Sequence, residues 1–500
     1  MVCGTGSDAG KSFLVAGLCR LLVGRGVKVA PFKAQNMALN AAVTAGGAEI
    51  GHAQWVQALA AGVEPEAVMN PVLLKPTGEC ASQVVVMGRA VGVQSARDYH
   101  DAKRDLLPVV LDALADLRSR YDVVICEGAG SPAEINLLDR DIVNLPLADA
   151  AGLRAIVVGD IDRGGVFAAL HGTVELLPPH LRRLVRGFVI NRLRGDPTLL
   201  GDACADLERR SGVPTLGVIP YLPGADLDAE DSLTLGRFAA GDATPGAGGD
   251  VDVLDVAAIR WPRVSNAGDL DPLRLEPHVA VRWVRSPADL GRPDLVVLPG
   301  SKDTRGDLAW FRGTGLADAV TRAVGGGAAV VAVCAGVQML GGSIDDPAGV
   351  EGHAGTDTGL GWLPLATRFD GNKVLDRPAG VAVSGPGAGQ RVSGYRIHHG
   401  RVGPLGDVAA WLVADDGEVL GWHAGGLCGT TLHGLLEDDG FRAAALGWVA
   451  DRSGKRWRPG TVRFVDARFE RFDRIAAAIE AHVDVDRLGG LIEEAGTGLP

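Results

Sequence analysis

Residues near the start of the chain have the types and spacing of a phosphate-binding loop. The sequence GTGSDAGKS at positions 4–12 places Gly-Lys-Ser directly before an apolar stretch with helical spacing. Glycines let backbone N–H groups converge on phosphate oxygens, and the start of the following helix adds a positive field. The lysine of such a loop reaches the outer phosphates of ATP, and the hydroxyl binds Mg²⁺. The predicted nucleotide-binding residues of this loop are Gly6, Ser7, Asp8, Ala9, Gly10, Lys11 and Ser12.

Two other interpretations of the loop explain less of the sequence. The G-x-G-x-x-A pattern at positions 4–9 meets a looser dinucleotide-binding motif, but the next predicted strand ends in Phe32 and Lys33, with no acid to hold a ribose. An ordinary glycine-rich turn gives no reason for the lysine and serine. The loop departs from the usual G-x-x-x-x-G-K-[ST] spacing, because Thr5 stands where the first glycine belongs. Few residues precede the loop, whereas a central strand needs about five, so we expect the natural start to lie upstream.

Acidic and amide side chains follow three other predicted strands. Glu127 comes directly after the strand at 122–126, where an acid that organises Mg²⁺ belongs, although a solvated acid at a strand end is the plainer alternative. Asp160 and Asp162 leave another strand, and the sequence does not distinguish a binding site from a turn there. Asn191 follows a third strand and either holds the purine base of the nucleotide or caps a helix.

A second group of chemically competent residues lies in the back half of the chain. An apolar run at 330–333 leads directly into Cys334, which is followed by the small residues Ala335 and Gly336 and by a helical pattern. A strand that stops at a nucleophile and turns into a helix exposes the side chain, and the helix N-terminus favours a thiolate. We therefore predict that Cys334 is a nucleophile rather than a buried small cysteine.

A cysteine nucleophile needs a base and donors for an oxyanion. We predict His433, which follows a short strand, as the base, and we expect the histidine pair at 398–399 to be structural. Gly300 and Ser301 follow another predicted strand, and their backbone amides are exposed there. Together with the N–H of Ala335 they are the predicted donors to the oxyanion.

The elements that position these residues alternate between strands and helices, which predicts an α/β fold with a parallel, doubly wound sheet. In the front half, strands are predicted at 27–31, 84–87, 122–126, 155–158, 187–190 and 215–219, with helices between them, as at 11–24 and 103–120. A second α/β pattern has strands at 279–284, 295–298, 329–333, 409–413 and 419–423. We predict a nucleotide-binding domain over 1–235, a glycine- and alanine-rich linker over 236–250, a second α/β domain over 251–450 and a C-terminal helical extension over 451–500.

The composition excludes several classes of protein. A net charge of −12 without a basic stripe argues against nucleic-acid binding. Seven cysteines are widely spread without a C-x-x-C pair, which gives neither a disulfide framework nor a zinc site and indicates a reducing cytoplasm. The uncharged stretch at 323–344 is long enough to span a membrane, but its glycines and central β-branched residues indicate a strand, a turn and a helix start. The sequence leaves the oligomeric state open.

Lysine is scarce in this chain, since only eight of the 49 basic residues are lysine. A lysine that persists against this bias marks a position where a compact ammonium is needed. The bias therefore selects Lys33 and Lys75, in addition to Lys11, as candidates for binding anions.

Together these motifs resemble the cobyric acid synthase family, and the resemblance covers nearly the whole chain. It rests on the loop G-T-x-S-D-x-G-K-S, the cysteine elbow C-x-G, a P-G-S-K at 299–302 and a T-x-L-H-G at 430–434. It extends to the segments at 31–37, 69–76, 127–136, 160–167 and 264–266. The front half resembles the dethiobiotin-synthetase type of phosphate-loop fold, and the back half resembles a class I glutamine amidotransferase.

The resemblance implies an ATP- and glutamine-dependent amidation of the b, d, e and g carboxylates of adenosylcobyrinic acid a,c-diamide, a corrinoid, to give adenosylcobyric acid. Cys334 would release ammonia from glutamine, with His433 moving protons. The phosphate loop, with Ser12 and Glu127 as the Mg²⁺ ligands, would support transfer of the ATP γ-phosphate onto a carboxylate. The substrate-binding candidates are Lys33, Asn36, Lys75, Asp160 and Asp162.

The sequence also departs from the family pattern and leaves alternatives open. Class I amidotransferases usually carry H-x-E, whereas Gly434 and Leu435 follow the histidine here, so a Cys–His pair or a third residue from elsewhere is expected. The nearest alternative is the a,c-diamide synthase, although Asn36 and the V-S-N segment with Asp269 and Asp271 favour the cobyric acid form. Another amidoligase, or a phosphate-loop scaffold with an inactive amidotransferase domain, are further alternatives.

Overall fold

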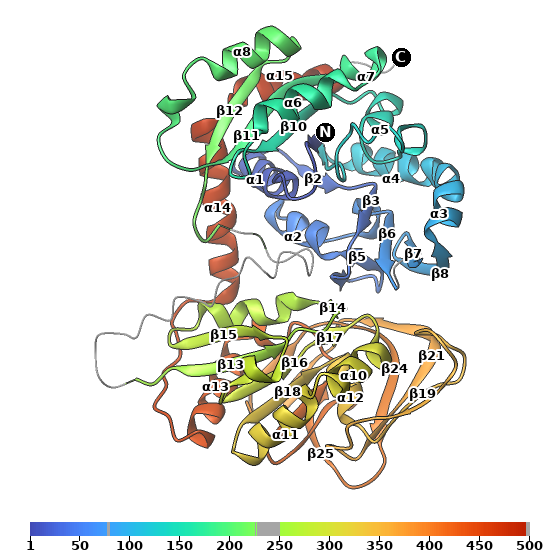
Figure 1. Cartoon of the computed structure of the whole chain (residues 1–500), viewed down its shortest axis with the longest axis vertical. Coiled ribbons are helices and arrows are strands. Elements are labelled where there is room, and N and C mark those ends of the chain that lie inside the picture. The colour runs from blue at the N-terminus through green and yellow to red at the C-terminus, as the bar shows by residue number, and fades with distance from the viewer. Residues whose placement is uncertain (78–80, 226, 228–250, 497–500) are drawn as a thin grey trace. The chain divides into compact units, whose positions relative to one another are not determined.

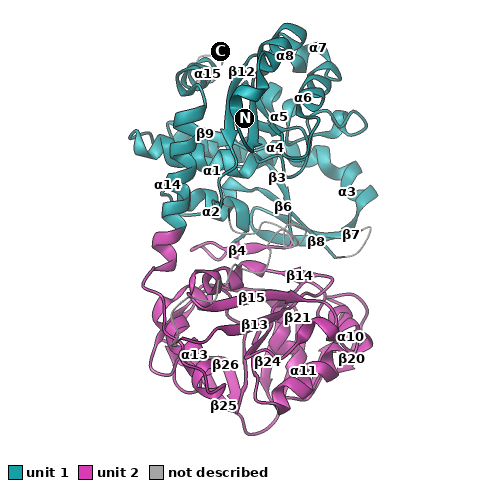
Figure 2. Cartoon of the chain, turned by 60° about the vertical axis from the view of Figure 1, so that its left-hand side comes forward, with its two compact units in different colours: residues 1–38, 48–227, 468–500 teal, residues 39–47, 228–467 magenta. Residues whose placement is uncertain are grey.

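The computed structural model describes residues 1–77, 81–225, 227 and 251–496 of the chain (Figure 1). The chain divides into two compact units, coloured separately in Figure 2. Unit 1 comprises Met1–Ala38, Ala48–Leu227 and Arg468–Pro500, and unit 2 comprises Leu39–Gly47 and Asp228–Ala467. The predicted linker at 236–250 lies outside the described residues.

Unit 1 is built on a parallel sheet, as predicted. Four strands pair in the order β1-β10-β11-β12, and β2 pairs with β9. A parallel bridge between Val2 and Glu127 joins the two groups, which places β1 between β9 and β10. All six residues of β10 are buried, in keeping with a strand covered on both faces. The strands are β1 (Val2–Gly4), β2 (Val29–Phe32), β9 (Val123–Cys126), β10 (Ala155–Asp160), β11 (Val185–Leu193) and β12 (Thr215–Pro220).

A smaller sheet of unit 1 has the order β3-β6-β7-β8. The strand predicted at 84–87 belongs to it as part of β7, which pairs antiparallel with both neighbours instead of joining the parallel sheet. The short interval after β7 permits a hairpin to β8, whereas a parallel neighbour needs a long crossover. The strands are β3 (Gln35–Met37), β6 (Val72–Pro76), β7 (Ala81–Val86) and β8 (Arg89–Ser95), with β5 (Glu49–Gly51) nearby in sequence.

The helices of unit 1 come from both ends of the chain. The first helix, α1, packs closely on α14, because a Cβ added at Gly17 would lie 2.4 Å from Ile479 Cδ1 and 2.5 Å from Ile475 Cγ2. The C-terminal residues predicted as an extension thus contribute to the core around the phosphate-loop helix. The helices are α1 (Lys11–Gly24), α2 (His52–Ala60), α3 (Ala96–Ala102), α4 (Leu107–Arg120), α5 (Leu145–Ala150), α6 (Val166–Glu175), α7 (Pro179–Arg182), α8 (Ala203–Ser211), α15 (Val485–Gly496) and α14 (Phe464–His482), which begins in unit 2.

Unit 2 contains a nine-stranded sheet in the order β15-β13-β16-β18-β27-β26-β25-β22-β23. Its first five strands run parallel, and the rest pair antiparallel. The strands are β13 (Leu254–Ile259), β15 (Val279–Val284), β16 (Leu295–Leu298), β18 (Ala329–Val333), β22 (Ala379–Ala382), β23 (Arg391–Ser393), β25 (Ala409–Ala414), β26 (Val419–Ala424) and β27 (Leu427–Thr430).

Further elements complete unit 2 around this sheet. A second sheet has the order β20-β19-β21-β24, and β14 pairs with β17. The strands of these two sheets are β14 (Val264–Ser265), β17 (Gly300–Ser301), β19 (Ser343–Asp346), β20 (Gly355–Thr358), β21 (Leu365–Asp376) and β24 (Arg396–Pro404), and unit 2 also contains β4 (Ala41–Val43). The helices are η6 (Ala267–Leu275), α9 (Pro287–Leu290), α10 (Thr304–Gly313), α11 (Leu316–Gly325), α12 (Ala335–Leu340), η7 (Leu435–Glu437) and α13 (Asp439–Arg452).

The uncharged stretch at 323–344 forms the end of α11, the strand β18, the helix α12 and the start of β19. This confirms the predicted strand, turn and helix start. Among the residues that the structure describes, no helix has the length and apolar character needed to cross a membrane.

Candidate active sites

The phosphate loop of unit 1 connects β1 to α1, as its sequence predicts. Gly10 stands at the helix start with φ of 104°, a backbone conformation that glycine adopts without strain. Lys11 donates hydrogen bonds from Nζ to the carbonyl oxygens of Gly6, at 2.8 Å, and Gly130, at 3.1 Å. The lysine therefore reaches back over its own loop toward the segment that follows β9.

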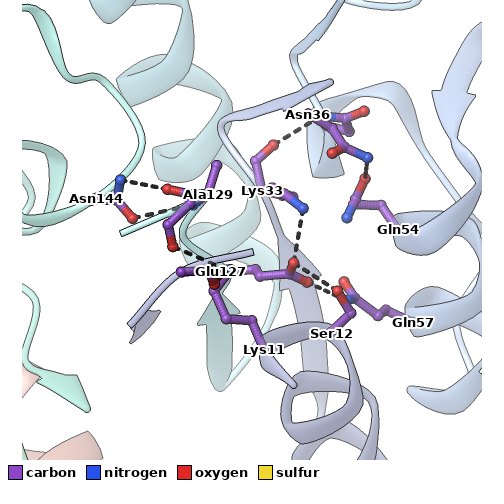
Figure 3. A network of polar contacts seen from close by, with 12 residues as sticks. Lys11, Ser12, Lys33, Asn36, Gln54, Gln57, Glu127, Ala129 and Asn144 are labelled. Carbon is purple, nitrogen blue, oxygen red and sulfur yellow. Dashed lines mark hydrogen bonds and ion pairs between the residues drawn. The ribbon is translucent and has the colours of Figure 1, made fainter. Parts of the chain in front are cut away.

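Glu127 is the centre of a buried polar network beside this loop (Figure 3). Its Oε1 accepts hydrogen bonds from Ser12 Oγ and Lys33 Nζ, both at 2.8 Å. Its Oε2 accepts a hydrogen bond from Gln57 Nε2 at 2.5 Å. Because a buried carboxylate is costly unless its oxygens are bonded, three donors from separate elements hold this one in a single orientation.

Amide side chains hold the backbone around that network. Asn144 accepts a hydrogen bond from the N–H of Ala129 at 3.1 Å and donates one to its carbonyl at 2.9 Å. Asn70 donates to the carbonyl of Lys33 at 3.0 Å, and the predicted substrate residue Asn36 donates to Gln54 at 3.0 Å. Lys33 and Asn36 therefore lie in the surroundings of the loop, as Figure 3 shows.

The structure places the other predicted residues of unit 1 differently. Lys75 is buried in an ion pair with Glu49 at 2.7 Å, on the β6 strand and away in sequence from the phosphate loop. Asp160 pairs with Arg192 at 2.7 Å, and that arginine also donates to the carbonyl of Asp8 at 2.9 Å. The acidic residue thus lies near the outer part of the loop.

Asp162 and Asn191 both contact neighbours in the protein. Asp162 pairs with Arg194 at 2.7 Å. Asn191 is buried, and its Nδ2 donates to the carbonyl of Ala9 at 3.2 Å. A Cβ on Gly10 would lie 2.0 Å from this Nδ2, so glycine is required for the contact. In this arrangement Asn191 supports the loop, and its predicted contact with a purine stays a prediction.

The oxygens of Ser12 and Glu127 fit a magnesium ion by their chemistry. Mg²⁺ prefers hard oxygen ligands and is usually held by one or two carboxylates together with phosphate oxygens and water. Among the residues that the structure describes, no group of three His, Cys, Asp or Glu side chains could hold a metal ion.

The cysteine elbow of unit 2 has the predicted geometry. Cys334 lies between the end of β18 and the start of α12, with φ of 54° and ψ of −110°, a conformation that non-glycine residues rarely adopt. The helix approaches β16 so closely that a Cβ on Gly336 would lie 2.1 Å from the carbonyl oxygen of Leu298. Glycine at this position therefore permits the sharp turn that presents the thiol.

Asp269 supplies the third member of the site, which the sequence left unidentified. Nδ1 of His433 lies 2.7 Å from Oδ2 of Asp269, and the N–H of Gly434 donates to Oδ1 at 2.9 Å. A carboxylate only accepts hydrogen bonds, so Nδ1 of His433 carries a proton, and Nε2 is available to interact with the thiol of Cys334. Burial lowers the pKa of His433, but Asp269 and a side-chain hydrogen bond with Cys334 outweigh it and raise the pKa to about 10.

The predicted oxyanion residues lie next to this histidine. Gly300 is in β17, and a Cβ at this position would lie 3.1 Å from Cε1 of His433. Ala335 is the first residue of α12, directly after the nucleophile. The side chain of Ser301 donates to Asp307 at 2.5 Å, so any part that Ser301 takes in the site comes from its backbone. Burial raises the pKa of Asp307 to about 7.

Sequence reasoning missed Asp269 and Gln57 as members of the two sites. Asp269 is distant from His433 in the sequence, and its segment was linked to the family but not to the histidine, so its place in η6 identifies its role. Gln57 is on α2, and a glutamine within a helical pattern gives no sign of a role in a site. His398, expected to be structural, is buried, and its burial lowers its pKa to about 3, so its ring is neutral.

Comparisons with known proteins match both halves of the chain. The family model of the CobQ/CobB/MinD/ParA nucleotide binding domain matches residues 1–235, and that of the CobB/CobQ-like glutamine amidotransferase domain matches residues 255–441. The chain is 49% identical to a cobyric acid synthase of Frankia casuarinae and 50% identical to one of Nocardia farcinica, each over 100% of this chain and 98% of the relative. It is 46% identical to one of Sorangium cellulosum, over 98% of both. The chain belongs to the cobyric acid synthase family.

Proposed function

We propose that this chain uses ATP and glutamine to amidate the b, d, e and g carboxylates of adenosylcobyrinic acid a,c-diamide, giving adenosylcobyric acid. The observation that carries the proposal is the Cys334–His433–Asp269 arrangement of unit 2. It occurs in the same chain as a phosphate loop whose serine is bonded to Glu127. One site supplies ammonia, and the other activates the carboxylate that receives it.

In the glutaminase half, the Cys334 sulfur attacks the side-chain amide carbon of glutamine. The C–N bond breaks, and ammonia leaves with a proton donated by His433, which leaves a thioester on the sulfur. Water then attacks the thioester and gives one proton to His433, glutamate forms as the C–S bond breaks, and His433 returns that proton to the departing thiolate. Asp269 keeps the ring in one tautomer and stabilises its charged form. We infer that the backbone amides of Gly300 and Ala335 stabilise the oxyanion.

In the synthetase half, a substrate carboxylate attacks the γ-phosphorus of ATP, and the bond to the bridging oxygen of ADP breaks. Ammonia then attacks the acyl phosphate, and phosphate leaves as the amide forms. A carboxylate needs this activation because ammonia alone does not displace its oxygen. Lys11 and the loop amides position the phosphates, and Lys33 places a second ammonium beside Glu127.

Magnesium at this site would be held by Ser12 and Glu127 together with phosphate oxygens, and when bound it neutralises charge on the phosphates. In the absence of the ion, the hydroxyl of Ser12 donates to Glu127, which leaves the oxygen lone pairs of the serine available for another partner.

The proposal also concerns the compartment and the substrate. Each of the six cysteines in the described part of the chain is a free thiol, which fits a reducing cytoplasm. The substrates are small molecules: ATP, glutamine and the corrinoid diamide. The a,c-diamide synthase reaction is the second candidate, because it needs the same two kinds of domain.

The test is incubation of the chain with ATP, Mg²⁺, glutamine and the a,c-diamide, followed by mass spectrometry. Each amidation replaces OH by NH₂, so the mass change counts the amidated carboxylates. We expect four replacements for the proposed reaction, and none with the diamide for the a,c-diamide synthase. Cys334→Ala should abolish glutaminase activity and preserve synthesis from free ammonia. Loss of ammonia-dependent synthesis in a folded Cys334→Ala variant would contradict the two-site mechanism.

A further inference from the structure

A short segment from the front half of the sequence belongs to the amidotransferase unit. Residues Leu39–Gly47 are part of unit 2, although the residues on either side belong to unit 1. Asn40 of this segment is 2% exposed, and its Oδ1 accepts a hydrogen bond from the backbone N–H of Asn266 at 2.6 Å. A second hydrogen bond joins the same segments, since Oδ1 of Asn266 accepts one from the backbone N–H of Ala41 at 3.1 Å.

Asn266 lies between two parts of the glutaminase site. The residues before it form β14, in which Ser265 pairs with Gly300 and Val264 with Ser301. The residues after it form η6, whose Asp269 holds His433. The conformation of Asn266 therefore affects both the oxyanion segment and the carboxylate that orients the base.

The backbone at Asn266 needs outside support. Its φ of 53° lies in the left-handed region, which costs an ordinary residue free energy and which asparagine tolerates better than most. Asn266 is also 5% exposed, so its backbone N–H has little access to water. Without Asn40, a buried N–H would lose its partner, and the turn into η6 would lose the contact that selects its conformation.

We infer that Asn40 is a positioning residue for the glutaminase reaction. It holds Asn266 in its left-handed turn, and the turn places Asp269 against His433 and β14 against Gly300. The segment at 39–47 is thereby a structural part of the glutaminase site, although it follows directly in sequence after Lys33 and Asn36. This inference rests on the proposed function of Cys334 and His433.

The test compares Asn40→Ala with Asn40→Asp, which keeps the accepting oxygen. For Asn40→Ala we expect the glutaminase kcat to fall about 5- to 30-fold, the effect of one lost orienting hydrogen bond, with a smaller change in KM. Iodoacetamide alkylation of Cys334, followed by peptide mass spectrometry, should slow in parallel. Synthesis from free ammonia should change by less than about twofold, and Asn40→Asp should recover most of the glutaminase activity. Asn372→Ala, at an exposed position of unit 2, is the matched control and should match the parent chain.

Two outcomes separate this inference from the function on which it rests. If Asn40→Ala hydrolyses glutamine within about twofold of the parent while Cys334→Ala is inactive, Asn40 does not position the site and the inference is wrong. If Cys334→Ala retains glutaminase activity, the proposed function itself fails. Should Asn40→Ala lose ammonia-dependent synthesis as well, Asn266→Ala and Asn266→Gly replace it, because both remove the acceptor for Ala41 but only glycine adopts the left-handed turn without strain. We then expect a selective loss of glutaminase in Asn266→Ala that Asn266→Gly does not share, and equal activities of the two variants overturn the inference.

Discussion

Replacing Asp269 by asparagine tests the third member of the glutaminase site. The carboxylate accepts from His433 through one oxygen and from Gly434 through the other. An amide has a single accepting oxygen, so in Asp269→Asn one of these two donors faces an NH₂ group. A hydrogen bond to a charged group contributes about 1.5–3 kcal/mol, which corresponds to a fall of about 10- to 150-fold in glutaminase kcat. Ammonia-dependent synthesis in unit 1 should be preserved.

The same substitution should change the pH dependence in a defined direction. Asp269 raises the pKa of His433 above its ordinary value of 6.5 against the effect of burial, so its contribution to stability is present below pH 6.5 and is lost as the pH rises through about 10. In Asp269→Asn, burial prevails and the pKa of His433 falls. We therefore expect the alkaline limb of kcat/KM for glutamine to move to lower pH, and the stability deficit of the variant to be largest in acid.

The assays are glutamate release across a pH series and chemical denaturation at pH 6 and pH 9. Asp271→Asn is the matched control, because it removes the same charge from η6 at a residue that forms an ion pair with Arg274. Its glutaminase activity and pH profile should follow the parent chain. A profile for Asp269→Asn that coincides with that of Asp271→Asn would refute the assignment of Asp269 as the residue that orients His433.

Further substitutions test other contacts. Lys33→Arg should impair synthesis and leave glutaminase largely intact, because a guanidinium does not fit the buried space of the ammonium; unchanged synthesis would make Lys33 a bystander. Gln57→Leu should weaken binding of ATP with Mg²⁺ about 5- to 10-fold in calorimetry, since one buried carboxylate oxygen loses its donor. Gly336→Ala should lower stability by at least about 1–3 kcal/mol in denaturant titrations, because its methyl group meets a backbone carbonyl. Asp307→Asn should gain stability relative to the parent as the pH rises through 7, because the raised pKa of Asp307 makes its ionisation destabilising, and equal pH dependence would contradict this.

The sequence predicted those parts of the two sites that form local motifs. The phosphate loop, the acid after β9 and the cysteine elbow each combine a strand end with the first turn of a following element, so their chemistry is visible within a few residues. The parallel strands around them were predictable for a related reason: strands covered on both faces are continuous apolar runs. The strand at 84–87 was misplaced because an apolar run does not reveal which neighbour it pairs with.

The remaining residues could not be read from local patterns. Asn40 and Asn266 are far apart in the sequence, and each is an ordinary amide in its own segment. Their relationship exists only because residues 39–47 are placed in unit 2. Lys75 was selected by the scarcity of lysine, which does not distinguish a buried partner such as Glu49 from a bound anion, so its predicted contact with an anion stays a prediction.

The two sites share a physical design that explains why their acids lie outside the motifs. In each, a buried carboxylate holds the reacting group of another element: Glu127 holds Ser12 and Lys33, and Asp269 holds His433. A buried carboxylate is itself stabilised only by its donors, so the acid and the groups that it orients constrain one another. The acid therefore comes from an element that the fold fixes beside the motif, the end of β9 for Glu127 and η6 for Asp269, rather than from the motif that carries the chemistry. Removing any one donor destabilises the carboxylate and releases the others from their common orientation.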